Sequence, residues 1–179
     1  NKGDKIAFIS KNSNALTSLF EILNNHTKPD AGEITVGTTI KSAYLPNDNS
    51  DHFNSNESLI DWLRRFAHTE EEREDVYLRT FLGRMLFTGE EALKSSSVLS
   101  GGEKVRCMLS KMMLAKGNLL FMDEPTNHLD LESITALNNA MTEYRGTLLF
   151  TSHDQQLVNT VANRIIEITP KGTIDKMMS

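Results

Sequence analysis

The stretch that decides the fold is Leu119-Leu-Phe-Met-Asp-Glu-Pro-Thr-Asn-His-Leu-Asp130. It opens with an apolar run of strand length and ends that run in two adjacent carboxylates, Asp123 and Glu124. Open α/β sheets bind ligands outside the carboxyl ends of their strands. There, the first carboxylate can help to hold Mg²⁺ and the second can orient an attacking water. The alternative is that Asp123 only caps the next helix and that Glu124 faces solvent.

Strand and helix patterns alternate on both sides of this stretch. Strands are expected at residues 5–9, 33–36, 42–45, 119–122, 147–151, 164–168 and 173–174. Helical spacing of apolar residues predicts helices at 16–23, 58–66, 70–86, 103–115, 131–144 and 155–162. The alternation in the second half predicts an α/β fold with a mostly parallel sheet. The acidic run Glu70-Glu-Glu72 suits a helix start and is expected to be solvated.

Length and composition indicate one soluble globular domain of 179 residues. The net charge of −5 gives no support to a nucleic-acid-binding face, although a local basic patch would not be visible in it. The single cysteine, Cys107, excludes an internal disulfide and is expected to lie buried on a helix. No apolar run approaches the roughly 18 residues of a membrane span. We therefore expect a cytoplasmic protein without a membrane partner, and the abrupt start suggests a piece of a longer chain.

A second motif, Leu99-Ser-Gly-Gly-Glu103, precedes one of the expected helices. Two glycines let the backbone N–H groups at a helix start approach an anion, and the Ser100 hydroxyl adds a donor. The same residues also satisfy a capping box between Ser100 and Glu103. The two interpretations are compatible, because helix capping and anion binding use the same N–H groups.

Together these strings resemble the motifs of ATP-binding-cassette (ABC) ATPases. Residues 123–130 resemble the family's Walker B motif and D-loop, residues 99–103 its signature loop, and Ser152-His153-Asp154 its switch histidine, all in the family's order. The resemblance implies an ABC-type P-loop NTPase core (residues 1–45 and 99–179), with a mostly parallel sheet and a small helical subdomain (46–98). ATP and Mg²⁺ are the implied cofactors, with Glu124 and His153 catalytic. The signature loop and Asp130 would bind nucleotide, and Asp123 and Thr17 would bind the metal.

The phosphate loop departs from the family. Where members carry G-x-x-G-x-G-K-[ST], this chain has Ser10-Lys-Asn-Ser-Asn-Ala-Leu-Thr17, so every glycine and the lysine are replaced. Glycines permit the torsions that aim N–H groups at phosphate, and the lysine supplies a charge between phosphates. Leu16 offers no charge and is expected to bury against the core. The residues aligned with this nucleotide-binding segment are Ser10, Lys11, Asn12, Ser13, Asn14, Ala15, Leu16, Thr17 and Ser18.

Two further positions bear on this site. Lys11 could replace the missing charge, but it lies on the wrong side of the loop's turn to do so easily. Asn47 aligns with a glutamine that contacts Mg²⁺ and water in the family, and its side chain is one methylene shorter. Asp123, Glu124 and His153 are unchanged. The sequence therefore predicts a degenerate site, in which the catalytic residues at the sheet edge are kept and the phosphate-binding groups are lost.

The string Asn127-His-Leu-Asp-Leu-Glu-Ser133 resembles the ABC-F group of tandem-cassette ATPases more closely than transporter subunits. Leu82-Gly-Arg-Met-Leu-Phe87 and Arg164-Ile-Ile-Glu-Ile-Thr-Pro170 resemble the C-terminal cassette of the group's YbiT-like branch. That resemblance implies a second cassette in the same chain and a role at the ribosome, in translation or antibiotic resistance. The signature loop (Ser100, Gly101, Gly102) would then close over ATP held by the partner cassette. The alternatives are a non-hydrolysing structural cassette and, less favoured by the D-loop, a transporter subunit.

Overall fold

The computed structural model describes residues 1–178. These residues form two compact units. The sheet unit comprises residues 1–47, 117–125 and the chain from 141 onward, and the helical unit comprises 48–116 and 126–140. The sequence assigns residues 46–98 alone to the helical part, whereas in the structure residues 99–116 and 126–140 also cluster there.

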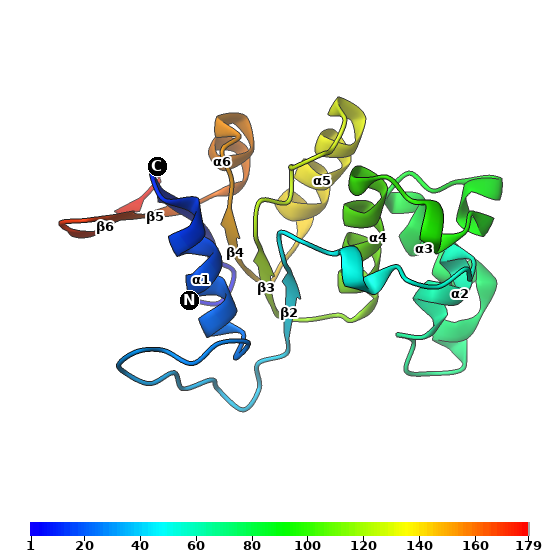
Figure 1. The fold of residues 1–179 in the computed structure, drawn as a ribbon, viewed down its shortest axis with the longest axis horizontal. Coiled ribbons are helices and arrows are strands. Elements are labelled where there is room, and N and C mark those ends of the chain that lie inside the picture. The colour runs from blue at the N-terminus through cyan, green and yellow to red at the C-terminus, as the bar shows by residue number, and fades with distance from the viewer. Residues whose placement is uncertain (179) are drawn as a thin grey trace. The chain divides into compact units, whose positions relative to one another are not determined.

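The sheet unit is built on six described strands in the order β2-β3-β4-β1-β5-β6 (Figure 1). The first five pair in parallel, and only β6 runs antiparallel to its neighbour β5, so the predicted mostly parallel sheet is confirmed. Since the parallel strands share one carboxyl edge, the residues that follow β1, β3 and β4 meet there. The bounds are β1 Lys5–Ser10, β2 Ser42–Leu45, β3 Leu119–Met122, β4 Thr147–Thr151, β5 Arg164–Thr169 and β6 Gly172–Met177.

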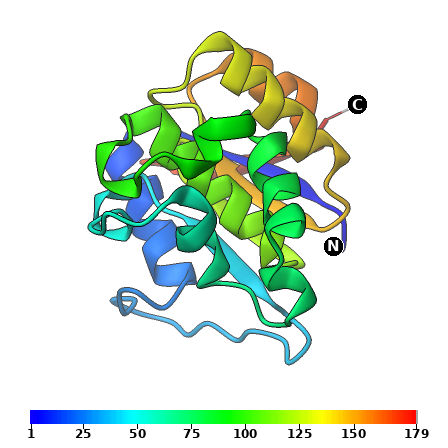
Figure 2. The ribbon, with the colours of Figure 1, turned by 90° about the vertical axis from the view of Figure 1, so that its right-hand side faces the viewer.

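The helical unit contains α2 (Leu59–Arg64), α3 (Asp75–Arg84) and α4 (Gly101–Leu114), which pack against one another (Figure 2, teal to green). Its central aromatic, Trp62, is fully buried, stacks on Phe53 and donates its indole N–H to the His52 carbonyl at 2.8 Å. The predicted burial of Cys107 on α4 is confirmed. The helix α5 (Leu131–Glu143) begins in this unit and ends in the sheet unit. Short 3-10 turns join the helices: η1 Ser50–His52, η2 Glu71–Arg73, η3 Gly89–Leu93 and η4 Ser96–Val98.

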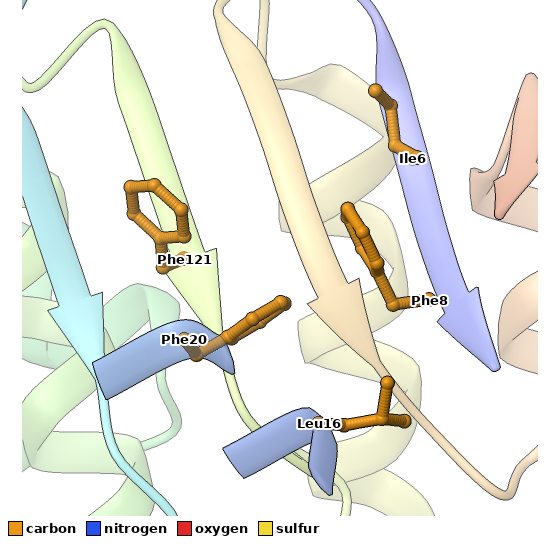
Figure 3. Packing of buried hydrophobic residues seen from close by; sticks show 5 residues of the cluster. All are labelled: Ile6, Phe8, Leu16, Phe20 and Phe121. Atoms are coloured by element: carbon orange, nitrogen blue, oxygen red, sulfur yellow. The ribbon is translucent and has the colours of Figure 1, made fainter. Parts of the chain in front are cut away.

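The core of the sheet unit lies between the sheet and α1 (Ser13–Leu23) (Figure 3). Phe20 of α1 meets Phe8 of β1 and Phe121 of β3 edge-on, with ring centroids 5.5 and 5.7 Å apart. Leu16 belongs to the same cluster and is 3% exposed, so its predicted burial is confirmed. This packing fixes α1 against the strands that carry the site. The last helix, α6 (Gln155–Val161), starts at Asp154, whose carboxylate caps it.

Two predicted elements differ from the structure. Residues 33–36 form no strand, because no described segment pairs with their backbone, and an isolated strand is not stable in water. The predicted helix 70–86 is broken into η2 and α3, because Glu74 between them has an extended backbone with ψ 137°.

The prediction that the acidic run 70–72 is solvated is wrong for one residue, Glu72. Glu72 is buried rather than solvated. Its carboxylate pairs with Lys116 at 2.8 Å and accepts the His68 backbone N–H at 2.9 Å. The hydrogen bonds and ion pair lower the pKa of Glu72 to about 2, with Lys116 as the largest cause. The two acidic neighbours, Glu70 and Glu71, are exposed as expected.

Candidate functional site

The centre of the candidate site is Asp123, which directly follows β3 and is 2% exposed. Two threonine hydroxyls donate to its carboxylate, Thr17 of α1 to Oδ2 at 2.6 Å and Thr151 of β4 to Oδ1 at 2.8 Å. The two residues that the resemblance assigns to a metal, Thr17 and Asp123, therefore lie together. Asp123 does not cap a helix, since α5 begins only at Leu131.

Thr151 is a site residue that the motif comparison misses. Its hydroxyl donates to Asp123 and accepts the Glu124 backbone N–H at 2.9 Å, so it joins the two carboxylate residues. The available signal is the parallel register of β3 with β4, in which Met122 lies opposite Phe150. The next residues along the two strands, Asp123 and Thr151, are then side by side.

Glu124 and His153 form the second part of the site. Glu124 is 6% exposed and has a left-handed backbone with φ 49°. Its Oε1 lies 3.3 Å from His153 Nε2, and its Oε2 accepts the His153 backbone N–H at 3.3 Å. Burial raises the pKa of Glu124, and the neighbouring His153 acts in the opposite direction. The solvated alternative for Glu124 is therefore wrong, and the predicted catalytic pair is adjacent.

The segment aligned with the phosphate loop is short and forms hydrogen bonds within itself. Only Lys11 and Asn12 link β1 to α1, and α1 already begins at Ser13, three residues before the predicted start. The Asn12 side chain caps this helix by accepting the Ala15 N–H at 3.3 Å, and Ser10 Oγ accepts the Asn12 N–H at 3.1 Å. Residues 11–15 are exposed, and no residue from 10 to 17 has a positive φ.

This segment differs from a phosphate cradle in two observed features. A phosphate cradle needs successive N–H groups that converge on the anion from alternating backbone torsions, together with a cation. Here one of these N–H groups is occupied by Asn12, and the position of the family's lysine is the buried Leu16. The oxygen donors of Thr17 and Asp123 suit a hard cation such as Mg²⁺ by their chemistry. Within residues 1–178, no group of three or more His, Cys, Asp or Glu side chains is arranged to hold a metal alone.

The signature-type loop lies at the start of α4. Ser100 is its N-cap, and its hydroxyl accepts the Glu103 N–H at 3.2 Å. Glu103 completes the capping box by accepting the Ser100 N–H at 2.8 Å, and its other oxygen binds Lys94 at 2.6 Å. Burial alone would raise the pKa of Glu103, but the hydrogen bonds from Lys94 and Ser100 outweigh it and lower that pKa. The predicted capping box between Ser100 and Glu103 is therefore confirmed.

The remaining predicted site residues are exposed or serve as a helix cap. Asn47 is exposed two residues after β2, and Ser18 is exposed on α1. Asp130 accepts the Ser133 N–H at 2.8 Å at the start of α5, and the hydrogen bonds from Ser133 lower its pKa. The structure thus gives Asp130 a capping role. Residues 10–18, Asn47, Asp123, Glu124 and His153 belong to the sheet unit, and the signature loop and Asp130 belong to the helical unit.

Sequence comparison assigns the chain to a family. The family profile described as "ABC transporter" matches residues 1–127, which is more than half of the chain. The chain belongs to the ABC transporter family. Within residues 1–178, no helix of this ABC domain combines the length and hydropathy needed to cross a bilayer.

Curated relatives place the ABC domain more closely. It is 56% identical to the ABC transporter ATP-binding protein YkpA of Bacillus subtilis (strain 168) over 100% of its own length and 33% of that protein. It is 39% identical to the probable ATP-binding protein YbiT of Escherichia coli O157:H7, covering 97% of the chain and 32% of the relative. The energy-dependent translational throttle protein EttA of Escherichia coli O6:H1 is 32% identical, with 97% and 31% covered. YbiT and EttA are ABC-F ATP-binding proteins, so the chain matches an ABC-F nucleotide-binding domain. The chain spans about a third of the length of each of the three relatives.

Solved structures agree on the fold. The protein titled "RNase-L Inhibitor" superposes with a TM-score of 0.79 at 22% identity, covering 97% of the ABC domain and 34% of that chain. A putative metal-chelate type ABC transporter superposes with a TM-score of 0.72 at 20% identity, covering 99% and 73%. At these identities the likeness shows the fold alone, and it confirms the predicted α/β P-loop NTPase class.

Proposed function

We propose that this ABC domain is one cassette of a longer ABC-F ATPase and that it acts through its signature loop rather than through its own phosphate loop. The observation that carries the proposal is the contrast between the two loops. In the segment aligned with the phosphate loop, Asn12 caps α1 and Leu16 lies in the core, whereas the signature loop keeps Ser100 and both glycines at the start of α4.

The signature face supplies suitable chemistry for a phosphate. The start of α4 presents backbone N–H groups and the positive end of the helix dipole, which favour an anion. Ser100 is exposed, so its hydroxyl can turn from the capping bond toward a ligand while Glu103 continues to hold the Ser100 backbone N–H. In this role the domain binds no nucleotide itself and completes a site on a second cassette, which the length of its relatives leaves room for.

The test is ATP turnover by the full-length protein. We expect Ser100→Ala to reduce kcat by about a hundredfold, the effect of losing one preorganised donor to a transferred group. Ser97→Ala, an exposed serine on the turn just before the loop, is the control and should leave turnover unchanged. Unchanged turnover in Ser100→Ala would remove the complementing role.

A ribosomal partner is the proposed setting. The support is the identity with EttA, whose name describes a translational throttle, together with the D-loop string 127–130. Cosedimentation of the full-length protein with ribosomes in Mg-ATP tests this part separately from turnover.

The second candidate is a cassette that only supports its partner's structure. The observation in its favour is that the polar side chains of the signature turn, Ser100 and Glu103, are already paired within the chain, with each other and with Lys94. The Ser100→Ala experiment distinguishes the two, because a purely structural cassette would tolerate loss of this hydroxyl in turnover.

A further inference from the structure

The D-loop, residues 127–130, lies directly on the two glycines of the signature loop. A Cβ added to Gly102 would meet the His128 carbonyl oxygen at 2.5 Å and the His128 carbonyl carbon at 3.4 Å. A Cβ added to Gly101 would lie 3.4 Å from His128 Cβ and 3.5 Å from its Cγ. Only glycine fits at position 102 without moving the His128 backbone, whether or not an anion binds there.

The backbone of His128 is held in an unusual conformation. Its φ of 65° lies in the left-handed region, which residues other than glycine seldom adopt unless the surrounding structure imposes it. The turn is closed by a hydrogen bond from the Leu129 N–H to the Thr126 carbonyl at 3.2 Å. Asp130, two residues on, is fixed as the cap of α5. These contacts direct the His128 carbonyl at Gly102.

We infer that His128 is a positioning residue that fixes the signature loop from the D-loop side. The loop is then held on three sides: by its own capping box, by Lys94 through Glu103, and by the His128 backbone. The role rests on the proposed function, because it matters for turnover only if the signature loop serves a nucleotide. The contact of His128 with the signature loop is present in the structure without a nucleotide.

The experiment is a double-mutant comparison in the full-length protein. Gly102→Ala should lower kcat by about tenfold or more, because the new methyl group displaces the His128 carbonyl and shifts the loop. Adding His128→Gly lets this carbonyl turn away at no steric cost. We expect the double variant to recover kcat by at least about threefold over Gly102→Ala, as for residues in direct contact. Purely additive losses would overturn the inference, since Gly102 would then matter only through the approach of nucleotide.

A second readout does not depend on turnover. In the full-length protein without nucleotide, His128→Gly should speed amide hydrogen exchange in peptides covering residues 100–104, where the Glu103 and Lys104 N–H groups are bonded to Ser100. Asn25→Gly is the matched control, because Asn25 is also left-handed, with φ 59°, and lies at the end of α1. Unchanged exchange in His128→Gly would overturn the inference even if Gly102→Ala fails to fold. If exchange becomes faster in His128→Gly but ATP turnover is unchanged in Ser100→Ala, the positioning role of His128 stands and the proposed function is rejected.

Discussion

At the scale of single residues, the neutral hydroxyl of Thr151 joins the two carboxylate residues of the site. One hydroxyl receives the Glu124 N–H and donates to Asp123, in a position that is 0% exposed. Buried polar groups are costly when unpaired, so a residue that satisfies two partners at once strongly restrains both.

Replacing this hydroxyl tests the network. Thr151→Val keeps the shape but leaves the buried Glu124 N–H without an acceptor and one Asp123 oxygen without a donor. We expect a loss of about 1–3 kcal/mol in the free energy of unfolding, measured by urea denaturation. Thr135→Val, an exposed threonine on α5 whose hydroxyl bonds only the Leu131 carbonyl, is the control and should change stability by less than about 0.5 kcal/mol. Equal effects in the two variants would contradict the account.

Glu124 gives a prediction with a pH dependence. Burial raises the folded-state pKa of this acid above its unfolded value, so its ionised form opposes folding at neutral pH. Glu124→Gln should therefore raise Tm at pH 8. The gain should shrink as the pH falls through the raised folded-state pKa toward the ordinary value of about 4.3, because Glu124 then becomes protonated in the folded state. Thermal unfolding of both proteins at pH 8 and pH 5 measures this, and a gain that grows toward pH 5 would contradict the assigned direction.

At the scale of elements, the link from β1 to α1 is the segment in which the chain departs from the family's phosphate-loop sequence. The helix begins early because Asn12 caps it, and its first buried residue, Leu16, joins Ile6, Phe8 and Phe20 in the core. We propose that this link serves as the start of a packed helix and not as a phosphate-binding loop.

Restoring the lysine alone should therefore damage the fold. Leu16→Lys places an ammonium group where the leucine is 3% exposed, and we expect it to cost at least about 2 kcal/mol, the lower end for truncating a core leucine. Asn14→Lys, on an exposed position of the same turn, should stay within about 0.5 kcal/mol of the parent. Chemical denaturation of the two variants gives the comparison. A Leu16→Lys variant as stable as the parent would mean that this turn does not need its leucine in the core.

The sequence predicts most of the sheet because each parallel strand is an apolar run with a turn on either side, as at Leu119–Met122. It does not predict that residues 33–36 stay unpaired, since Ile34 and Val36 alternate as a strand would and local patterning carries no information about a partner. The same limit applies to Glu72, whose partner Lys116 lies 44 residues away. Among site residues, motifs locate Asp123, Glu124 and His153, whereas Thr151 and the contact of His128 with Gly102 depend on tertiary neighbours.

At the scale of the whole molecule, we propose a domain that has the carboxylates and histidine of a catalytic site and a signature loop but no phosphate cradle. Asp123, Glu124 and His153 remain assembled in the sheet unit, and Ser100 remains at the start of α4 in the helical unit. The chain spans about a third of its relatives, so the proposed nucleotide site belongs to a cassette elsewhere in the full-length protein.

The most direct measurement is an isothermal titration of Mg-ATP into this domain beside a variant carrying Ser10→Gly, Ser13→Gly, Ala15→Gly and Leu16→Lys, with circular dichroism confirming that both are folded. We expect no binding heat from the natural domain. The restored variant should bind, because its loop can again present N–H groups and a charge to phosphate. Comparable binding by the two would contradict the central claim, since Thr17, Lys11 and the Asp123 edge would then hold the nucleotide without a phosphate cradle.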